Sequence, residues 1–382
     1  MIQFFEKVLG KENITIEKSD LEIYSTDSSQ ILGLPKMVCW PKDSQQIHQI
    51  ILYSRRNKTT ISPRGSGTNL VGCIKSKNSI ILDLSQMDEI LDKGKDYVTV
   101  EAGIKLKDLN EKIAPLYFPI VLANNDSCTI GGMISTNASG PESIKFGRMQ
   151  DWVSEIEIID GSGRIKKIKH NFCGLEGQTG IIITAKLKVL PQKPEYVSMD
   201  VLKFHDYESL LQKTIELKQD KEIILLELIN HKAAKITNLS DTNYLIVVYT
   251  SEKGDTKTLT EIQEVINLRH SIPDKLYLEG YRIEEDIQIS HENMVEFLYW
   301  LDKNDIPVYG HIGVGGLHPT LKRRTYIKNL ITEVQRLGGE FNFEYGIGTL
   351  KKQYQSETIK QELLEIKKRF DPFNIINTNM EK

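Results

Sequence analysis

Cysteine is scarce in this sequence, and long apolar runs are missing. The 382 residues include only four cysteines, which are widely spaced and form no CxxC pair. This spacing disfavours a disulfide framework, a zinc ribbon and an iron–sulfur cluster. No apolar run approaches the roughly 20 residues that cross a bilayer, and charge comes too early in the N-terminal segment for a signal peptide. We therefore expect a cytoplasmic protein without a transmembrane segment; peripheral contact with a membrane stays open.

The sequence also has no marked excess of positive or negative residues. Lysine and arginine total 49, aspartate and glutamate total 52, and the net charge is −3. This balance gives no electrostatic footprint for nucleic acid. With 40% hydrophobic and 26% charged residues, the composition is that of a globular protein, and the length indicates two or three domains.

Two glycine-rich segments dominate what is present. Residues 63–69 (PRGSGTN) follow a β-prone run, and residues 129–132 (TIGG) begin a second turn later in the chain. Glycine lets a backbone approach a phosphate closely and direct successive N–H groups at it. For either segment alone, an ordinary tight turn is the alternative. The spacing matches neither the GxGxxG fingerprint nor the P-loop pattern. Together the two segments suggest one anion that is bound from two sides.

The residues around these segments predict alternating helices and strands. Asp43 precedes Gln46 by three, a capping-box pattern that predicts a helix over residues 44–56. Apolar and polar residues alternate over 155–159 and 183–189, which predicts strands, and residues 161–163 (GSG) predict a hairpin turn.

Four motifs in this order resemble a known family. They are PRGSGTNL, TIGGMISTNASG, KFGRMQDWVSEIEIIDGSG and GLEGQTGIIITAKL. The chain is similar to flavoproteins of the vanillyl-alcohol oxidase superfamily with a PCMH-type FAD-binding domain, and closest to the glycolate oxidase GlcD-type and D-lactate dehydrogenase group. The resemblance implies an α+β fold: a two-subdomain FAD-binding domain and an α+β cap domain with an antiparallel sheet. It divides the chain into a lead-in (1–34), the FAD-binding domain (35–192), the cap domain (193–340) and a returning segment (341–382).

The resemblance assigns cofactor contacts position by position. The pyrophosphate would lie in a cradle of Arg64, Gly65, Ser66, Gly67, Thr68 and Asn69, covered from the other side by Thr129, Gly131, Gly132 and Ser135. Gly140, Phe146 and Gly147 would lie along the flavin, and Gly180, Ile181 and Ile183 would line the adenine and ribose end. Asn377, in a closing DPFNIIN segment, would approach the flavin or serve only in a turn. Some relatives attach FAD through a histidine in the first loop; because this loop has none, we predict non-covalent FAD.

Two histidines and a glutamate form a candidate metal site in the second half. His311 and His318 lie in YGHIGVGGLH, where glycines predict a strand end and a turn, and Glu344 follows in FEYGIG. Two imidazoles and a carboxylate with open positions are a ligand set of the catalytic kind. The alternative is that each histidine is a satisfied polar residue in a turn. The resemblance implies that all three are ligands of a divalent Zn, Mn or Fe ion.

The sequence departs from the family at several positions of this site. Val314 and Gly316 replace the usual Asp and Asn of HxGDGNxH, and Tyr345 stands where relatives carry a histidine base. A tyrosine, with an ordinary pKa of about 10, is a poorer base near neutrality. Arg269 matches an arginine that binds a substrate carboxylate; a surface cation is the alternative. A later lysine of the relatives corresponds to Glu284 here, and Arg282 is a nearby substitute.

These assignments imply an FAD-dependent dehydrogenase of a D-2-hydroxy acid of the lactate, glycolate or 2-hydroxyglutarate class. Hydride would pass from Cα to the flavin, with the metal polarising the hydroxyl, Arg269 binding the carboxylate and Tyr345 assisting proton removal. The acceptor would be a quinone, an electron-transfer protein or an iron–sulfur subunit. Two alternatives stay open: a metal-independent flavin oxidase of a sugar or alcohol, and a flavin-carrying subunit of a larger electron-transfer complex.

Overall fold

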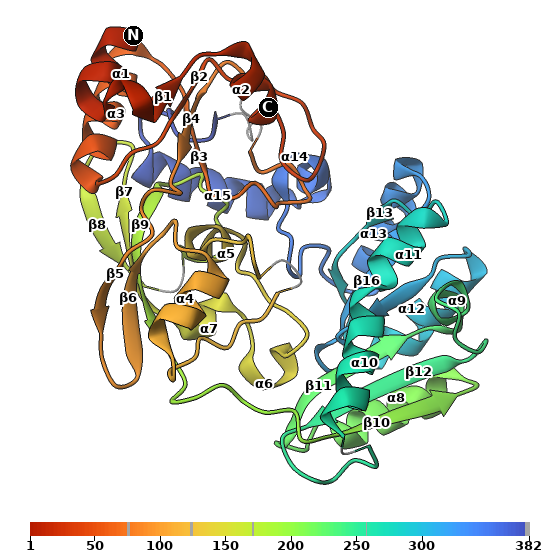
Figure 1. The fold of residues 1–382 in the computed structure, drawn as a ribbon. Helices are drawn as coiled ribbons and strands as arrows, with labels where there is room; N and C mark the ends of the chain where they lie inside the picture. Colours follow the sequence, from red (N-terminus) through yellow and green to blue (C-terminus); the bar gives the residue numbers. More distant parts are fainter. Residues whose placement is uncertain (75–76, 123–124, 170–171, 257, 379–382) are drawn as a thin grey trace.

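The computed structural model describes residues 1–74, 77–122, 125–169, 172–256 and 258–378. Three sheets organise the chain (Figure 1). Two belong to a body built by the first half of the sequence together with the C-terminal helix, and the third forms a second body beside it. Among the described residues, no helix has both the length and the apolar character needed to cross a bilayer.

The first sheet carries the first glycine segment. Its order is β1-β2-β4-β3, in which β2, β4 and β3 are parallel and β1 is antiparallel to β2. The helix α3 (Ser44–Asn57) begins as predicted, because Oδ1 of Asp43 accepts a hydrogen bond from the N–H of Gln46 at 2.8 Å. Residues 63–69 turn where β3 ends. The strands are β1 (Ile14–Thr15), β2 (Met37–Cys39), β3 (Ile61–Arg64) and β4 (Ile80–Asp83), and α1 (Ile2–Leu9) and α2 (Lys18–Ile23) precede them.

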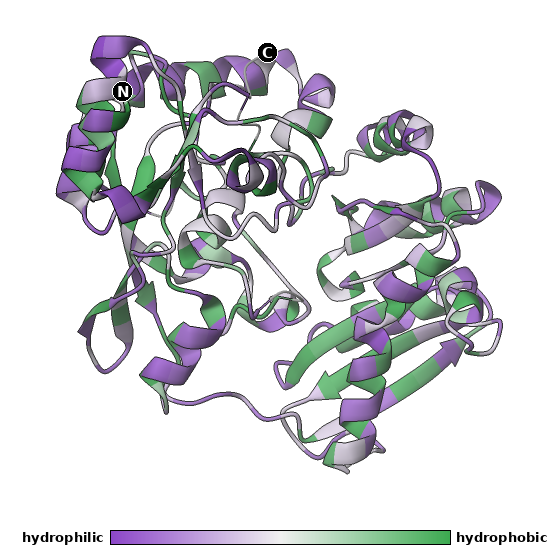
Figure 2. Ribbon diagram, turned by 45° about the horizontal axis from the view of Figure 1, so that its top comes forward, coloured by the Kyte–Doolittle hydropathy of each residue, from purple (hydrophilic) through white to green (hydrophobic). Residues whose placement is uncertain are grey.

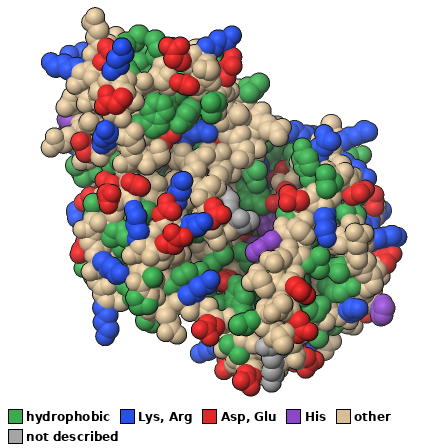
Figure 3. Space-filling model, viewed as in Figure 1, with side chains coloured by type: hydrophobic (Ala, Val, Ile, Leu, Met, Phe, Trp, Pro, Cys, Tyr) green, Lys and Arg blue, Asp and Glu red, His purple; other side chains and the backbone are tan. Residues whose placement is uncertain are grey.

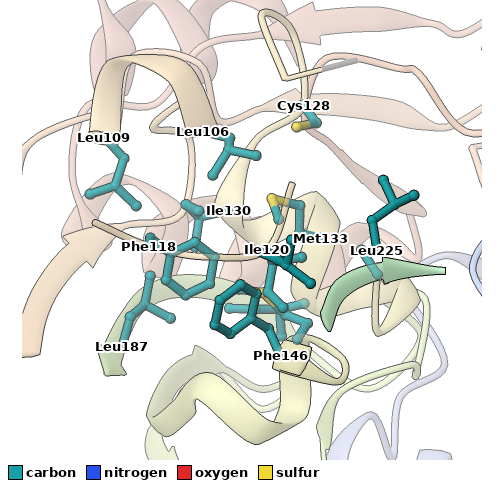
Figure 4. Close-up of a cluster of buried hydrophobic side chains, with 14 of the residues drawn as sticks. Leu106, Leu109, Phe118, Ile120, Cys128, Ile130, Met133, Phe146, Leu187 and Leu225 are labelled. Atoms are coloured by element: carbon teal, nitrogen blue, oxygen red, sulfur yellow. The ribbon is translucent and has the colours of Figure 1, made fainter. Parts of the chain in front are cut away.

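The second sheet is antiparallel throughout, in the order β5-β6-β9-β7-β8. The predicted hairpin at residues 161–163 is confirmed, because Ile159 pairs with Ile165 across it. Figure 4 shows Leu187 of this sheet packed in one apolar cluster with Leu106, Leu109 and Phe118. The elements are β5 (Ile90–Lys93), β6 (Tyr97–Glu101), α4 (Leu106–Ile113), β7 (Val153–Ile159), β8 (Ile165–Ile168) and β9 (Ile181–Lys188).

The second glycine segment is not the simple turn that the sequence suggested. Residues 130–136 form the helix α5 (Ile130–Thr136), and the Thr129 hydroxyl accepts a hydrogen bond from the N–H of Gly132 at its start. Burial of Ile130, Met133 and Ile134 stabilises this helix despite its two glycines, whose intrinsic helix propensity is low. Two short helices follow, α6 (Ser143–Phe146) and α7 (Met149–Trp152).

The third sheet is the antiparallel sheet expected for the cap, with helices on both faces. On one face, Leu226 and Leu228 share an apolar cluster with α8 and α12. On the other, Ile229 and Tyr309 share a cluster with α10 and α11. Figure 2 shows these central strands as hydrophobic ribbons between helices of mixed character. The strand order is β10-β12-β11-β15-β16-β13, with β14 paired to β16.

The cap strands are β10 (Ser198–Phe204), β11 (Ile223–Ile229), β12 (Asn243–Tyr249), β13 (Ile283–Glu284), β14 (Ile287–Gln288), β15 (Val308–Gly310) and β16 (Gly316–Leu321). The cap helices are α8 (Tyr207–Leu217), α9 (His231–Ile236), α10 (Leu259–His270), α11 (Ile272–Leu278), α12 (His291–Lys303) and α13 (Ile327–Arg336). The helices α9 and α11 have only six and seven residues, too few to show a clear helical periodicity in the sequence.

The C-terminal segment returns to the first body. After α14 (Gly348–Lys351), the helix α15 (Glu357–Phe370) crosses that body (Figure 1). Ile376 then forms a parallel bridge with Ile61 of β3. Buried Lys367 donates to the carbonyl oxygens of Gln178 at 2.8 Å and Ile376 at 2.6 Å, and lies 3.1 Å from Asp371. We propose the division 1–34, 35–192, 193–340 and 341–382 on this path of the chain.

Replacement of Lys367 by alanine should destabilise the protein by about 3 kcal/mol, since it leaves the Asp371 carboxylate buried without its cation. The free energy of unfolding in urea measures this effect. Lys368→Ala, one residue along and exposed, is the matched control and should change it by less than about 0.5 kcal/mol. Equal effects of the two substitutions would contradict the anchoring role of Lys367.

Candidate active site

The glycine segments and the histidine–glutamate set line one cavity of about 480 Å³. It lies where the two bodies meet, and Figure 3 shows histidine atoms at that junction. Its volume is in the range of small-molecule and cofactor sites. Thirteen of the seventeen residues that the sequence assigned to the cofactor line it: Arg64, Gly65, Ser66, Gly67, Thr68, Asn69, Thr129, Gly131, Gly132, Ser135, Gly140, Gly180 and Asn377.

The two glycine segments converge, as one shared anion would require. A Cβ added to Gly65 would collide with Oγ1 of Thr129, so only glycine allows this approach. The Ser66 hydroxyl donates a hydrogen bond to the carbonyl oxygen of Ser127. Among the described residues, the backbone N–H groups of residues 65–69 find no hydrogen-bond acceptor. A run of free donors beside a cavity is the arrangement that binds phosphate oxygens.

The Arg64 side chain packs against the first glycine loop. Its guanidinium donates to the carbonyl oxygen of Thr26 at 2.9 Å and lies 5.0 Å from the ring centre of Tyr24. Gly67 has φ +73°, and a Cβ there would collide with this guanidinium. Burial lowers the pKa of Arg64, against the attraction of Asp83. The arginine therefore places a positive charge directly behind the free N–H groups of the loop.

Four predicted cofactor residues do not line the cavity. On β9 successive side chains alternate between core and cavity; Ile181 and Ile183 are buried in the core, and Ile182 lines the cavity instead. Phe146 packs edge-to-face against Trp152 at a centroid distance of 6.0 Å, in the cluster of Figure 4. Gly147 abuts the carboxylate of Asp151. The sequence motif indicated the correct segments, but the strand register decides which side chains face a ligand.

The register of the cap sheet brings the metal candidates together. Tyr309 pairs with His318 across β15 and β16, so their side chains share one face of the sheet, and His311 lies two residues beyond Tyr309. Nε2 of His311 lies 3.4 Å from Nε2 of His318 and 3.1 Å from Oε1 of Glu344. Nε2 of His318 lies 3.7 Å from Oε2 of Glu344.

These separations fit a metal ion. Tetrahedral ligands at about 2.0–2.1 Å from a zinc ion lie about 3.3 Å from one another. Oε1 of Glu344 is buried, and no hydrogen bond of good geometry reaches it among the described residues, although Nε2 of His311 lies 3.1 Å away. A buried carboxylate oxygen without a donor is costly in a protein that binds nothing there. The residues present therefore fit a divalent ion.

Hydrogen bonds aim both imidazoles at this point. Glu227 accepts a hydrogen bond from Nδ1 of His311, so Nε2, which faces Nε2 of His318, is the nitrogen left to bind an ion when it loses its proton. The Tyr345 hydroxyl donates to Glu284, and its oxygen lies 3.4 Å from Nδ1 of His318. With its hydrogen given to Glu284, the Tyr345 oxygen accepts from Nδ1, and Nε2 of His318 also presents a lone pair.

The pKa values follow from burial and from these carboxylates. Burial alone would lower the pKa of His311, but Glu227 and Glu344 raise it to about 9. Burial lowers the pKa of His318 to about 3, against the attraction of Glu344. Burial and then Glu284 raise the pKa of Tyr345 well above its ordinary value. This direction does not favour Tyr345 as a base that removes a proton.

Arg269 is not the surface cation that the sequence left as an alternative. Its side chain is buried near the end of α10, and Nε donates to Oε2 of Glu227 at 2.7 Å. The guanidinium also lies 5.0 Å from the ring centre of Tyr309 and lines the cavity. Burial would raise the pKa of Glu227, but Arg269 and His311 lower it to about 2. The Glu227 carboxylate thus pairs with both His311, a metal candidate, and the Arg269 guanidinium.

Sequence reasoning missed Glu227, Asp286 and Lys351. Glu227 is the one charged residue in the otherwise apolar strand β11, a signal that was present in the sequence. Asp286 accepts hydrogen bonds from the backbone N–H groups of Glu344 at 2.6 Å and Tyr345 at 2.9 Å. Lys351 donates to Asp286 and lies 3.0 Å from Glu285. Nothing in the run Glu284–Glu285–Asp286 distinguishes it from an exposed acidic turn.

Further hydrogen bonds tie the metal candidates to the first body. Nδ2 of Asn69 donates to the carbonyl oxygen of Tyr345 at 2.9 Å. The Glu176 carboxylate accepts from the N–H groups of Ile347 and Gly348, and Nδ2 of Asn377 donates to the Glu176 carbonyl oxygen at 3.0 Å. The two parts of the cavity are therefore held in fixed relation.

Comparisons with known proteins agree with this architecture. A family model for an FAD binding domain matches residues 35–169, and one for the C-terminal domain of FAD linked oxidases matches residues 255–380. The solved structure of an alkyldihydroxyacetonephosphate synthase has a TM-score of 0.71 and covers 98% of this chain and 84% of that one. At 14% identity it shows the fold alone.

Curated relatives span nearly the whole chain, each at 25% identity. A mitochondrial D-2-hydroxyglutarate dehydrogenase of Arabidopsis thaliana covers 98% of this chain and 80% of the relative. Glycolate oxidase subunit GlcD of Bacillus subtilis covers 97% and 94%, and D-lactate dehydrogenase of Archaeoglobus fulgidus covers 93% and 94%. The chain belongs to the flavoproteins with a PCMH-type FAD-binding domain, and it is an enzyme of their FAD-linked oxidase branch.

Proposed function

We propose that this protein is an FAD-dependent dehydrogenase that oxidises a D-2-hydroxy acid to the 2-oxo acid. One observation carries the proposal: His311, His318, Glu344 and Arg269 face the same cavity as both glycine segments. A 2-hydroxy acid needs one site for its hydroxyl, one for its carboxylate and one for a hydride acceptor, and this cavity offers all three. The names of the relatives support lactate, glycolate and 2-hydroxyglutarate as candidate substrates.

FAD would lie with its pyrophosphate on the free N–H groups of residues 65–69. Arg64 supplies a positive charge behind them, and Thr129, Gly131, Gly132 and Ser135 would close the other side. Gly140, Gly180 and Asn377 line the remaining length of the cavity. Bound FAD supplies the redox chemistry, since it takes up the hydride that leaves the substrate Cα.

His311, His318 and Glu344 would hold a divalent ion, which would supply Lewis acidity toward the substrate hydroxyl. Three protein ligands leave a coordination position open, as catalytic sites do. Zn, Mn and Fe all accept imidazole and carboxylate ligands. Glu227 and Tyr345 would fix the two imidazole tautomers, so that neither histidine must reorient when the ion binds.

Arg269 would bind the substrate carboxylate. Its Nε donates to Glu227, while its terminal nitrogens have no acceptor among the described residues and can form a bidentate pair. The ion pair with Glu227 also fixes the distance between the carboxylate site and His311. We assign Tyr345 the role of orienting His318 rather than that of a free base.

The name of one relative favours a version of this function in which the chain is one subunit of a larger complex. The Bacillus subtilis relative is named a subunit, so this chain would pass electrons to a partner such as an iron–sulfur subunit. The alternative acceptors are a quinone or an electron-transfer protein. We propose a cytoplasmic location, with peripheral membrane contact if the acceptor is a quinone.

Precipitation with acid should release the flavin into the supernatant, because no histidine lies in the first glycine loop. Absorbance of the supernatant near the flavin maximum measures the released fraction. We expect nearly all of it to be released; flavin that stays with the pellet would contradict non-covalent binding.

Removal of divalent metal with a chelator should abolish turnover of 2-hydroxy acids and leave FAD bound. Readdition of Zn, Mn or Fe should restore it, and His318→Ala should prevent that recovery because one ligand is lost. His231→Ala, which removes a half-buried histidine at the start of α9 outside the cavity, is the control. Full turnover by the metal-free protein would contradict the metal role of His311, His318 and Glu344. It would favour the alternative of a metal-independent flavin oxidase.

Arg269→Lys should raise KM for 2-hydroxy acids by about tenfold to a hundredfold, since a point charge replaces a bidentate donor but still balances Glu227. Steady-state kinetics with one substrate measure KM and kcat separately. Arg282→Lys, which changes an exposed arginine outside the cavity, should leave both unchanged. An unaltered KM in Arg269→Lys would remove the carboxylate assignment.

A further inference from the structure

Glu284 places a negative charge on the wall of the cavity beside the metal candidates. It pairs with Thr320 across β13 and β16, and Thr320 lies two residues from His318, so the three side chains share one face of the sheet. Glu284 lines the cavity together with Arg269 and Tyr309. A ligand held at Arg269 and the histidines would therefore share its cavity with this carboxylate.

Both oxygens of this carboxylate are held in place. The Tyr309 hydroxyl donates to Oε2 and the Tyr345 hydroxyl donates to Oε1. The orientation is thus fixed before any ligand arrives. Each oxygen keeps a lone pair, and each tyrosine has already given its only hydrogen. The group can accept further hydrogen bonds but offers none.

Glu284 has no ion-pair partner among the described residues, although the Arg269 guanidinium attracts it at longer range. Among the described residues, no lysine or arginine lies within ion-pair distance of it. The cation on this wall, Arg269, is already paired with Glu227 at 2.7 Å. A second carboxylate on the ligand would meet repulsion here, whereas an N–H or O–H donor would find a prepared acceptor.

We propose that Glu284 makes this enzyme selective for 2-hydroxy acids whose side chain ends in a hydrogen-bond donor, an amide, amine or hydroxyl, in place of a second carboxylate. The inference rests on the proposed function, since it takes the carboxylate at Arg269 and the hydroxyl at the trio as given. It narrows the substrate class, because a dicarboxylate such as 2-hydroxyglutarate is disfavoured.

The test compares two ligands of equal length, D-malate and its 4-amide, with the FAD-loaded and metal-loaded protein under anaerobic conditions. Dissociation constants come from the change in flavin absorbance where the flavin stays oxidised, and from the saturation of the reduction rate with ligand concentration where it is reduced. We expect D-malate to bind at least fivefold more weakly than the amide. Glu284→Gln should bring the ratio to within twofold of unity, since glutamine keeps an acceptor for one tyrosine but removes the charge.

Glu279→Gln, exposed and outside the cavity, is the matched control and should keep the wild-type ratio. A ratio below fivefold in the wild type, an unchanged ratio in Glu284→Gln, or failure of the amide to bind would each overturn the proposal. Flavin that is perturbed but never reduced by any 2-hydroxy acid would instead count against the proposed function, and the ratio would still decide the role of Glu284.

Discussion

The site depends on one buried carboxylate. Glu227 is fully buried on β11 and contacts Arg269 with one oxygen and His311 with the other. A carboxylate in such a place is stable only when it is paired and hydrogen-bonded, and here both partners are candidate ligand-binding groups. The same pairing that stabilises Glu227 therefore sets the separation and orientation of Arg269, the proposed carboxylate-binding cation, and His311, the metal candidate.

A second set of buried charges holds the segment that carries Glu344 and Tyr345. Asp286 fixes the backbone of Glu344 and Tyr345 and is itself paired with Lys351. Asn69 then ties Tyr345 to the first glycine loop. Hydrogen bonds from Asn69 and to Asp286 thus hold the backbone next to Glu344, the third metal candidate, in a fixed position beside the first glycine loop. Because these groups are already ordered, ligand binding costs less conformational entropy at this site.

Much of this arrangement could be predicted from the sequence. The helix over residues 44–56, the hairpin at 161–163 and the antiparallel cap sheet follow from periodicity and from the family resemblance, and the structure confirms them. Glycines and spacing mark His311, His318 and Glu344 as a candidate set, and the family resemblance implies that all three are metal ligands. Local patterns could not decide between Ile181, Ile183 and Ile182, because strand register is a property of the whole sheet. Asp286 and Lys351 were missed because a buried ion pair between distant segments has no local signature.

The central claim is that the flavin and the histidine–glutamate trio act on one substrate in one cavity. Anaerobic addition of matched D- and L-2-hydroxy acids to the FAD-loaded, metal-loaded protein tests it most directly, with flavin absorbance as the readout. The account predicts that the D enantiomer bleaches the flavin within seconds to minutes while the L enantiomer leaves it oxidised. Failure of every 2-hydroxy acid to bleach the flavin would contradict it.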